Sequence, residues 1–171
     1  MSDRTGAVTM HGNPLTLTGN EVKVGDQLPE AVVLDNDLNP VKISDFIGKV
    51  LVISVVPSLD TPVCDLQTRR FNNEAAGLGP EVTILTISMD LPFAQKRWCG
   101  AAGVDQLKTL SDHREASFGL AYGLLIKELR LLARAVLVAD RSGKITYIQN
   151  VQELSQEPEY DPVLTAVKAL I

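Results

Sequence analysis

The pattern of apolar and polar positions predicts a chain in which strands and helices alternate through the central part. Val50–Val56 is almost continuously apolar and β-branched, which is typical of a strand covered on both faces. Val82–Met89 has the same character, and helical stretches over Val63–Ala76 and Pro92–Ala102 follow the two strands. This β-α-β-α order predicts an α/β sheet with parallel strands that helices cover.

Shorter elements flank this central unit. Turn residues separate three pairs of short apolar stretches, and each pair predicts a hairpin. The pairs are Ala7–Met10 with Leu15–Leu17, Ala31–Leu34 with Val41–Ile43, and Ala135–Val138 with Ile145–Ile148. We also expect a short helix over Glu115–Tyr122 and a closing helix over Val163–Ile171. The order fits a thioredoxin-like fold, with a central mixed β-sheet flanked by helices and an N-terminal β-hairpin. A flavodoxin-like fold fits less well, because helices would also separate its later strands.

Length and charge narrow the class of protein. The 171 residues predict a single domain over 1–171, with the hairpin at about 5–18 and the core at about 22–171. The formal net charge of −5 argues against broad electrostatic binding to nucleic acid. The longest apolar stretch is about a third of a membrane span, so we expect no membrane segment. The start, MSDRTGAVTM, lacks the pattern of a secretory signal, and we therefore expect a cytoplasmic protein.

Two cysteines, Cys64 and Cys99, are the first candidates for chemistry. In a reducing compartment, cysteines are more often catalytic, metal-binding or inert than bridged. Neither cysteine lies at zinc-ligand spacing from the other or from His11 and His113, so we expect no metal site and no cofactor. The count alone leaves two alternatives open, buried apolar fillers and reactive thiols.

The surroundings of Cys64 favour the reactive alternative. It lies in the first turn of a predicted helix, after a central strand and a loop bounded by Pro57 and Pro62. A helix N-terminus carries partial positive charge and free N–H groups, which favour a thiolate over a thiol. Active sites of α/β proteins lie beyond the carboxyl ends of the strands, as this loop does. Thr61 is either a helix cap or a hydrogen-bonding group beside the sulfur.

The segment around Cys64 resembles a known active site. Residues 57–71 read PSLDTPVCDLQTRRF and resemble the active-site segment of the thiol peroxidases, a bacterial branch of the peroxiredoxins. They contain the peroxiredoxin signature P-x-x-x-T-x-x-C and the narrower pattern D-T-P-V-C-D-x-Q-T-R-R-F. The resemblance continues in Arg97–Gly100, Thr109–Asp112, Ser117–Gly119, Tyr122–Gly123 and Leu131–Val136, and so spans nearly the whole chain.

The resemblance implies a role for each residue around the sulfur. Cys64 is the peroxidatic cysteine, which attacks hydrogen peroxide or an organic hydroperoxide as a thiolate and becomes a sulfenic acid. Pro57 shields the thiolate from water, and Thr61 hydrogen-bonds the sulfur and the peroxide. Arg134 orients the peroxide and stabilises the thiolate. Without the resemblance, Arg134 is better interpreted as a surface charge at a strand edge.

The resemblance also gives the second cysteine a role. Cys99 matches the resolving cysteine, which condenses with the sulfenic acid of Cys64 in the same chain before further oxidation occurs. A disulfide needs Cβ atoms within about 4.5 Å, so we expect local unwinding of one or both helices during turnover. Gly100 and Gly103 lower the cost of that unwinding, or simply mark an ordinary helix end. Thioredoxin is the implied reductant and a homodimer the implied assembly.

Two other functions compete with a peroxidase. The first is a peroxide-sensing redox switch that signals to a partner through the same Cys64–Cys99 disulfide. The second is a thiol–disulfide oxidoreductase, against which the sequence lacks a C-x-x-C motif.

Overall fold

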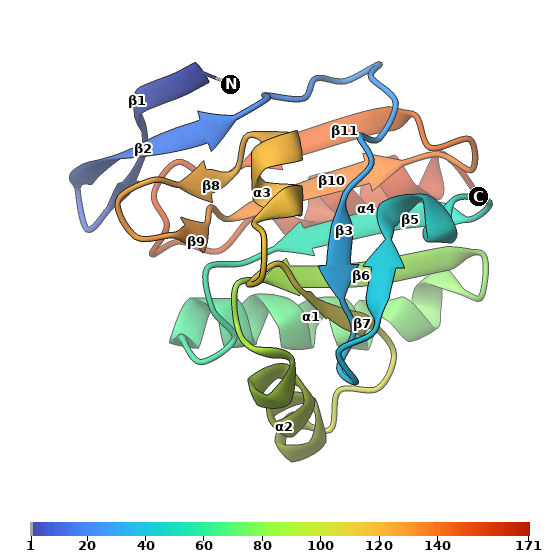
Figure 1. Cartoon of the computed structure of the whole chain (residues 1–171). Helices are drawn as coiled ribbons and strands as arrows, with labels where there is room; N and C mark the ends of the chain where they lie inside the picture. The colour runs from blue at the N-terminus through green and yellow to red at the C-terminus, as the bar shows by residue number, and fades with distance from the viewer. Residues whose placement is uncertain (1) are drawn as a thin grey trace.

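The computed structural model describes residues 2–171, and a seven-stranded sheet forms its centre (Figure 1). The strands run in the order β11-β10-β5-β6-β7-β3-β4. Their bounds are β3 Val32–Leu34, β4 Pro40–Lys42, β5 Val50–Val55, β6 Val82–Ser88, β7 Lys108–Ser111, β10 Ala135–Ala139 and β11 Ile145–Asn150. Strands β5, β6 and β7 are parallel, whereas β10 and β3 pair with them in the antiparallel sense. The central sheet is therefore mixed, as predicted.

A second, smaller sheet contains the N-terminal hairpin. Its strands are β1 Ser2–Met10, β2 Asn13–Gly19, β8 Leu125–Ile126 and β9 Leu131–Leu132, in the order β1-β2-β8-β9. Strands β1 and β2 form the predicted hairpin and are longer than the apolar stretches indicated. The two-residue strands β8 and β9 were not predicted, because two residues are too few to show an alternating pattern.

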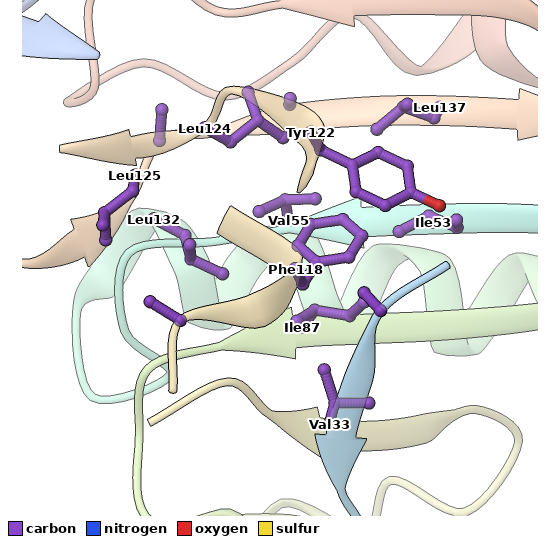
Figure 2. Close-up of a cluster of buried hydrophobic side chains, with 14 of the residues drawn as sticks. Val33, Ile53, Val55, Ile87, Phe118, Tyr122, Leu124, Leu125, Leu132 and Leu137 are labelled. Carbon is purple, nitrogen blue, oxygen red and sulfur yellow. The ribbon is translucent and has the colours of Figure 1, made fainter. Parts of the chain in front are cut away.

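Helices and the smaller sheet cover the two faces of the central sheet. The helices are α1 Pro62–Leu78, α2 Pro92–Ala102, α3 Ser117–Tyr122 and α4 Tyr160–Lys168, with a 3-10 helix at Ile43–Phe46. On β5, Val50 and Val52 pack with residues of α1 and α4. Ile53 and Val55 face the opposite side, where α3 and the smaller sheet pack (Figure 2). This alternation confirms that β5 is covered on both faces.

The bounds of two predicted helices need correction, and one strand was not predicted. Helix α1 continues through Gly77 and ends at Leu78, two residues beyond the predicted end. The closing helix begins at Tyr160, three residues before the predicted start, because Pro162 lies in its first turn, where a backbone N–H needs no partner inside the helix. It ends at Lys168, three residues before the predicted end. Strand β7 was missed, because three of its four residues are polar although it pairs on both sides.

Helix α3 holds the smaller sheet against the core. Gly19 at the end of β2 has a φ of 115° and lies so close to the Leu120 carbonyl that a Cβ would overlap it. Helix α3 begins without a cap from its own N-cap residue, and the buried Asp112 carboxylate takes over this task. It accepts the backbone N–H groups of Phe118 at 2.9 Å and Gly119 at 2.8 Å. Burial nevertheless raises the pKa of Asp112 to about 6.

We expect Asp112 to make stability depend on pH. Because its pKa is raised on folding, its favourable contribution is complete below the unfolded value of about 3.9 and is lost as pH rises through about 6. The loss is on the order of 3 kcal/mol, from roughly two pKa units. Urea unfolding of wild type and Asp112→Asn between these limits measures it. The difference in unfolding free energy between the two proteins should shrink with rising pH, and a difference that stays constant across this range would contradict the assignment.

Candidate active site

Cys64 lies at the carboxyl end of β5, in the first turn of α1. Pro62 opens the helix with its fixed φ, and the chain between β5 and the helix forms a short loop. The Cys64 side chain has no exposed surface and packs against Val56, Leu59 and Trp98. The predicted placement beside the positive end of a helix is confirmed, and the sulfur is shielded from bulk water.

Arg134 reaches the sulfur from the chain segment that leads into the strand next to β5. It directly precedes β10, whose first residue, Ala135, pairs with Val55 at the end of β5. This register brings Arg134 to the end of β5 that leads to Cys64, and its Nη1 donates to Cys64 Sγ at 3.3 Å. Arg134 is only 2% exposed, so its interpretation as a surface charge is wrong.

Two groups, Gln67 and the Leu154 carbonyl, orient the Arg134 guanidinium through three hydrogen bonds. Nη1 also donates to Gln67 Oε1 at 3.0 Å, and Nε and Nη2 donate to the Leu154 carbonyl at 3.2 and 2.7 Å. Gln67 in turn donates from Nε2 to Ser54 Oγ at 2.7 Å. A buried guanidinium with several fixed donors is suited to hold a charge that develops nearby.

The sequence interpretation assigned no role to Gln67, Ser54 or Leu154. Gln67 had a usable signal, because it follows Cys64 by three residues and so lies on the same face of the helix. Ser54 is the one polar residue within the apolar β5 run, which was a weaker signal. Leu154 contributes a backbone carbonyl, for which no side-chain pattern exists.

Thr61 and Pro57 belong to the loop that leads into α1. Pro57 is buried, whereas Thr61 is exposed and occupies the N-cap position. The Thr61 hydroxyl donates to the Ser58 carbonyl at 2.8 Å, so the alternative that it caps the helix is wrong. Among residues 2–171 no hydrogen bond joins Thr61 to the Cys64 sulfur, and that contact stays a prediction. Asp90 anchors the loop by accepting the Ser58 hydroxyl at 2.7 Å.

A cavity of about 450 Å³ opens above this group. Its wall includes Pro57, Thr61 and Arg134, and the hairpin residues Met10 and His11 also line it. Further lining residues are Pro62, Val63, Leu154 and Ser155. The cavity therefore gathers three of the five predicted site residues, and Arg134 connects it to the buried sulfur.

Cys99 lies on α2 in different surroundings. Its Sγ is 3.5 Å from Thr109 Oγ1, and it lines a separate cavity of about 460 Å³ together with Asn36. Burial raises the pKa of the Cys99 thiol. Both cysteines are free thiols, and it is the neighbouring Trp98 that packs against Cys64.

Comparison with known proteins identifies the family of this chain. The Redoxin family model matches residues 23–164. A thiol peroxidase of Halalkalibacterium halodurans is 58% identical over 165 residues, which cover 96% of this chain and 99% of that protein. A thiol peroxidase of Bacillus subtilis is 57% identical over 164 residues, with coverage of 96% and 98%. The chain belongs to the thiol peroxidase family.

A solved structure shares the fold of this chain. A peroxiredoxin-like protein from Aquifex aeolicus superposes with a TM-score of 0.90 at 46% identity, and the match covers 98% of both chains. A thioredoxin-like fold was predicted from the order of the elements, and this agreement confirms it. Residues 2–171 contain no helix long and apolar enough to cross a bilayer. The same residues contain no group of three or more His, Cys, Asp or Glu side chains placed to hold a metal ion.

Asp65 joins the two cysteine-bearing helices of this protein. Its carboxylate accepts the Trp98 indole N–H at 3.0 Å and the Arg69 Nε at 2.8 Å. Arg69 also lies over the Trp98 ring and donates to the Ala102 carbonyl near the end of α2. These contacts hold Trp98 beside Cys64 and keep α2 in the position seen here.

Proposed function

We propose that the protein is a thiol-dependent peroxidase that reduces hydrogen peroxide and organic hydroperoxides, with Cys64 as the nucleophile. The single observation that carries the proposal is the 3.3 Å contact from Arg134 Nη1 to the buried Cys64 Sγ at a helix start. Membership of the thiol peroxidase family supports it. The apolar part of the cavity wall, which includes Met10, Val63 and Leu154, suits the carbon chain of an organic hydroperoxide.

The first step is attack of the Cys64 thiolate on the outer oxygen of the peroxide. A sulfur–oxygen bond forms while the O–O bond breaks, so the sulfur is oxidised to a sulfenic acid and the peroxide is reduced. The departing oxygen leaves as alkoxide or hydroxide and takes up a proton. Negative charge moves from sulfur to that oxygen, and the Arg134 guanidinium is already in place to stabilise it. Thr61 lines the cavity at this point and is proposed to contact the peroxide.

The second step joins the two cysteines. The Cys99 thiol attacks the sulfenic acid, an S–S bond forms, the S–O bond breaks, and water leaves. Cys64 and Cys99 occupy separate surroundings, so α2 has to move. Its end is suited to this, because Gly103 terminates the helix in the left-handed conformation with a φ of 68°. Local unwinding of α2 is therefore part of the proposal.

The third step returns the enzyme to its reduced form. A thioredoxin-type dithiol reduces the Cys64–Cys99 disulfide by thiol–disulfide exchange and becomes oxidised itself. The homodimer and the cytoplasmic location implied by the family resemblance stay predictions. The redox-switch alternative is not favoured, because relatives more than half identical over nearly the full chain are thiol peroxidases.

Steady-state turnover tests the proposal as a whole. The reduced protein is mixed with thioredoxin, thioredoxin reductase and NADPH, and NADPH consumption is followed after addition of hydrogen peroxide or an alkyl hydroperoxide. A peroxidase consumes NADPH in proportion to the peroxide added. A redox switch would be oxidised once and would show no sustained consumption.

Arg134→Lys is expected to slow the first step about 100- to 1000-fold, which is the usual cost of losing one preorganised donor. Lysine keeps the charge but cannot serve the sulfur, Gln67 and the Leu154 carbonyl together. Peroxide loss in a single turnover of the reduced protein measures the rate. Arg141→Lys is the matched control, because Arg141 donates to the Leu170 carbonyl on the exposed surface. Equal rates in the two variants would remove Arg134 from the mechanism.

A further inference from the structure

Glu153 ties the turn of the N-terminal hairpin to the segment between β11 and α4. Its carboxylate accepts the backbone N–H groups of His11 at 3.2 Å and Gly12 at 2.8 Å, and the Thr9 hydroxyl at 3.0 Å. From its own segment, Ser155 donates through its hydroxyl at 2.7 Å and its N–H at 2.9 Å. These donors favour the carboxylate and lower the pKa of Glu153 to about 2, with the Ser155 hydroxyl first among them. Glu153 is therefore charged throughout the neutral range.

The next residue along the chain holds the active-site arginine. The Leu154 carbonyl accepts both Nε and Nη2 of Arg134. The Leu154 N–H donates to the Thr9 carbonyl at 2.8 Å, and the Thr9 N–H donates to the Gln152 carbonyl at 2.7 Å. A continuous path of hydrogen bonds thus runs from β1, through the segment that contains Glu153, to the guanidinium that contacts Cys64.

The same turn forms a wall of the peroxide cavity. Met10 and His11 line it together with Pro57 and Arg134. His11 has a φ of 50°, a left-handed conformation that non-glycine residues rarely adopt. The Glu153 carboxylate accepts the N–H of this residue and of the following glycine, and so holds the turn in that conformation.

From these contacts we infer that Glu153 is a positioning residue for the peroxide step. Its carboxylate fixes the hairpin turn and the Leu154 carbonyl together, and the carbonyl keeps the Arg134 guanidinium directed at Cys64. Glu153 does not itself line the cavity, so it acts through its neighbours. The inference rests on the proposed function for its effect on peroxide. Its effect on the ionisation of Cys64 can be measured without peroxide.

The test compares Glu153→Ala with Glu128→Ala. Glu128 is a matched control, because its carboxylate also binds the hairpin backbone, accepting the Thr16 N–H at 2.9 and 3.0 Å. Within residues 2–171 it makes no hydrogen bond to the segment that holds Arg134. We expect Glu153→Ala to slow peroxide loss in a single turnover about 10- to 100-fold, as small misplacements of reacting groups do. Glu128→Ala should react as fast as wild type. Glu153→Gln keeps one acceptor oxygen and is expected to lie between wild type and Glu153→Ala.

Two further measurements separate positioning from general stability. In a Cys99→Ser background, alkylation of Cys64 by iodoacetamide should reach half its limiting rate at higher pH in Glu153→Ala, because Arg134 no longer faces the thiolate. In Glu153→Ala with both cysteines present, reduction of the preformed Cys64–Cys99 disulfide by thioredoxin should keep its wild-type rate. A Glu153→Ala protein that is folded by circular dichroism and matches wild type in peroxide rate and alkylation profile would overturn the inference, and so would equal losses in Glu128→Ala.

Failure of the proposed function gives a different pattern. In that case the wild-type protein itself would not consume peroxide, whichever residue stands at position 153. The alkylation profile would then still decide whether Glu153 controls the Arg134–Cys64 contact. An unchanged profile in both Glu153→Ala and Glu153→Gln would refute that control.

Discussion

Cys64→Ser is expected to abolish peroxide consumption, with a loss of at least about a thousandfold, as for removal of other catalytic nucleophiles. A serine hydroxyl does not ionise near neutral pH and is a poor nucleophile toward an O–O bond. The Arg134 contact cannot compensate, because it stabilises a charge that serine does not carry. Both single-turnover peroxide loss and NADPH consumption with the thioredoxin system should disappear, and a sulfenic-acid trapping reagent should find no adduct.

The fold should survive this substitution. Serine is close to cysteine in size, and its oxygen can accept the same hydrogen bond from Arg134 in the fully buried site. Thermal unfolding followed by circular dichroism serves as the control for folding. Peroxide consumption by a folded Cys64→Ser protein at the wild-type rate would refute Cys64 as the nucleophile and leave Cys99 as the only thiol to explain it.

Cys99→Ser is expected to separate the two halves of the cycle. The first reaction should proceed at about the wild-type rate, because Cys99 contacts Thr109 and lines a cavity apart from the peroxide site. Sustained turnover with thioredoxin should fall sharply, because the sulfenic acid has no partner in the chain. The trapping reagent should label Cys64 in this variant after one equivalent of peroxide. The two cysteine variants are therefore controls for each other.

Trp98 provides an independent view of the same step. Its side chain packs against Cys64 and binds Asp65, so disulfide formation has to change its surroundings. Oxidised and reduced wild type should differ in tryptophan emission, and Cys99→Ser should lose that difference. Identical emission in the two wild-type states would contradict a rearrangement of α2.

The turnover experiment has its own contradicting outcome. Full turnover by Cys99→Ser would exclude Cys99 as the resolving residue.

The order of apolar runs and helical stretches along the chain made much of the fold predictable. The apolar runs at β5 and β6 and the helices after them are local patterns of sufficient length, and their order indicated a mixed sheet. Strand β7 was not predictable in this way, because its residues are mostly polar and its pairing partners come from distant parts of the chain. Helix bounds shifted by two or three residues where Pro162 and Gly77 proved compatible with a helix.

Local sequence patterns were sufficient to identify Cys64, the proposed nucleophile, and the helix that carries it. Cys64, the preceding loop and the helix start lie within a few residues of one another, so local spacing and the family motif were sufficient to find them. The residues that surround the sulfur, in contrast, are brought together by the fold. Arg134 stands 70 residues away along the chain and reaches Cys64 because β10 pairs with β5 in one register.

The groups that hold Arg134 in place could not be identified from any sequence pattern. The Leu154 carbonyl is a backbone group, and the Glu153 carboxylate binds a turn 141 residues earlier in the chain. The separate surroundings of Cys64 and Cys99 likewise follow from packing, since Trp98 packs against the cluster that contains Cys64 whereas Cys99 lies beside Thr109. Local chemistry depends on neighbours in the chain, which the sequence shows directly. The geometry of the site depends on which distant segments pair and pack, and this is a property of the folded protein alone.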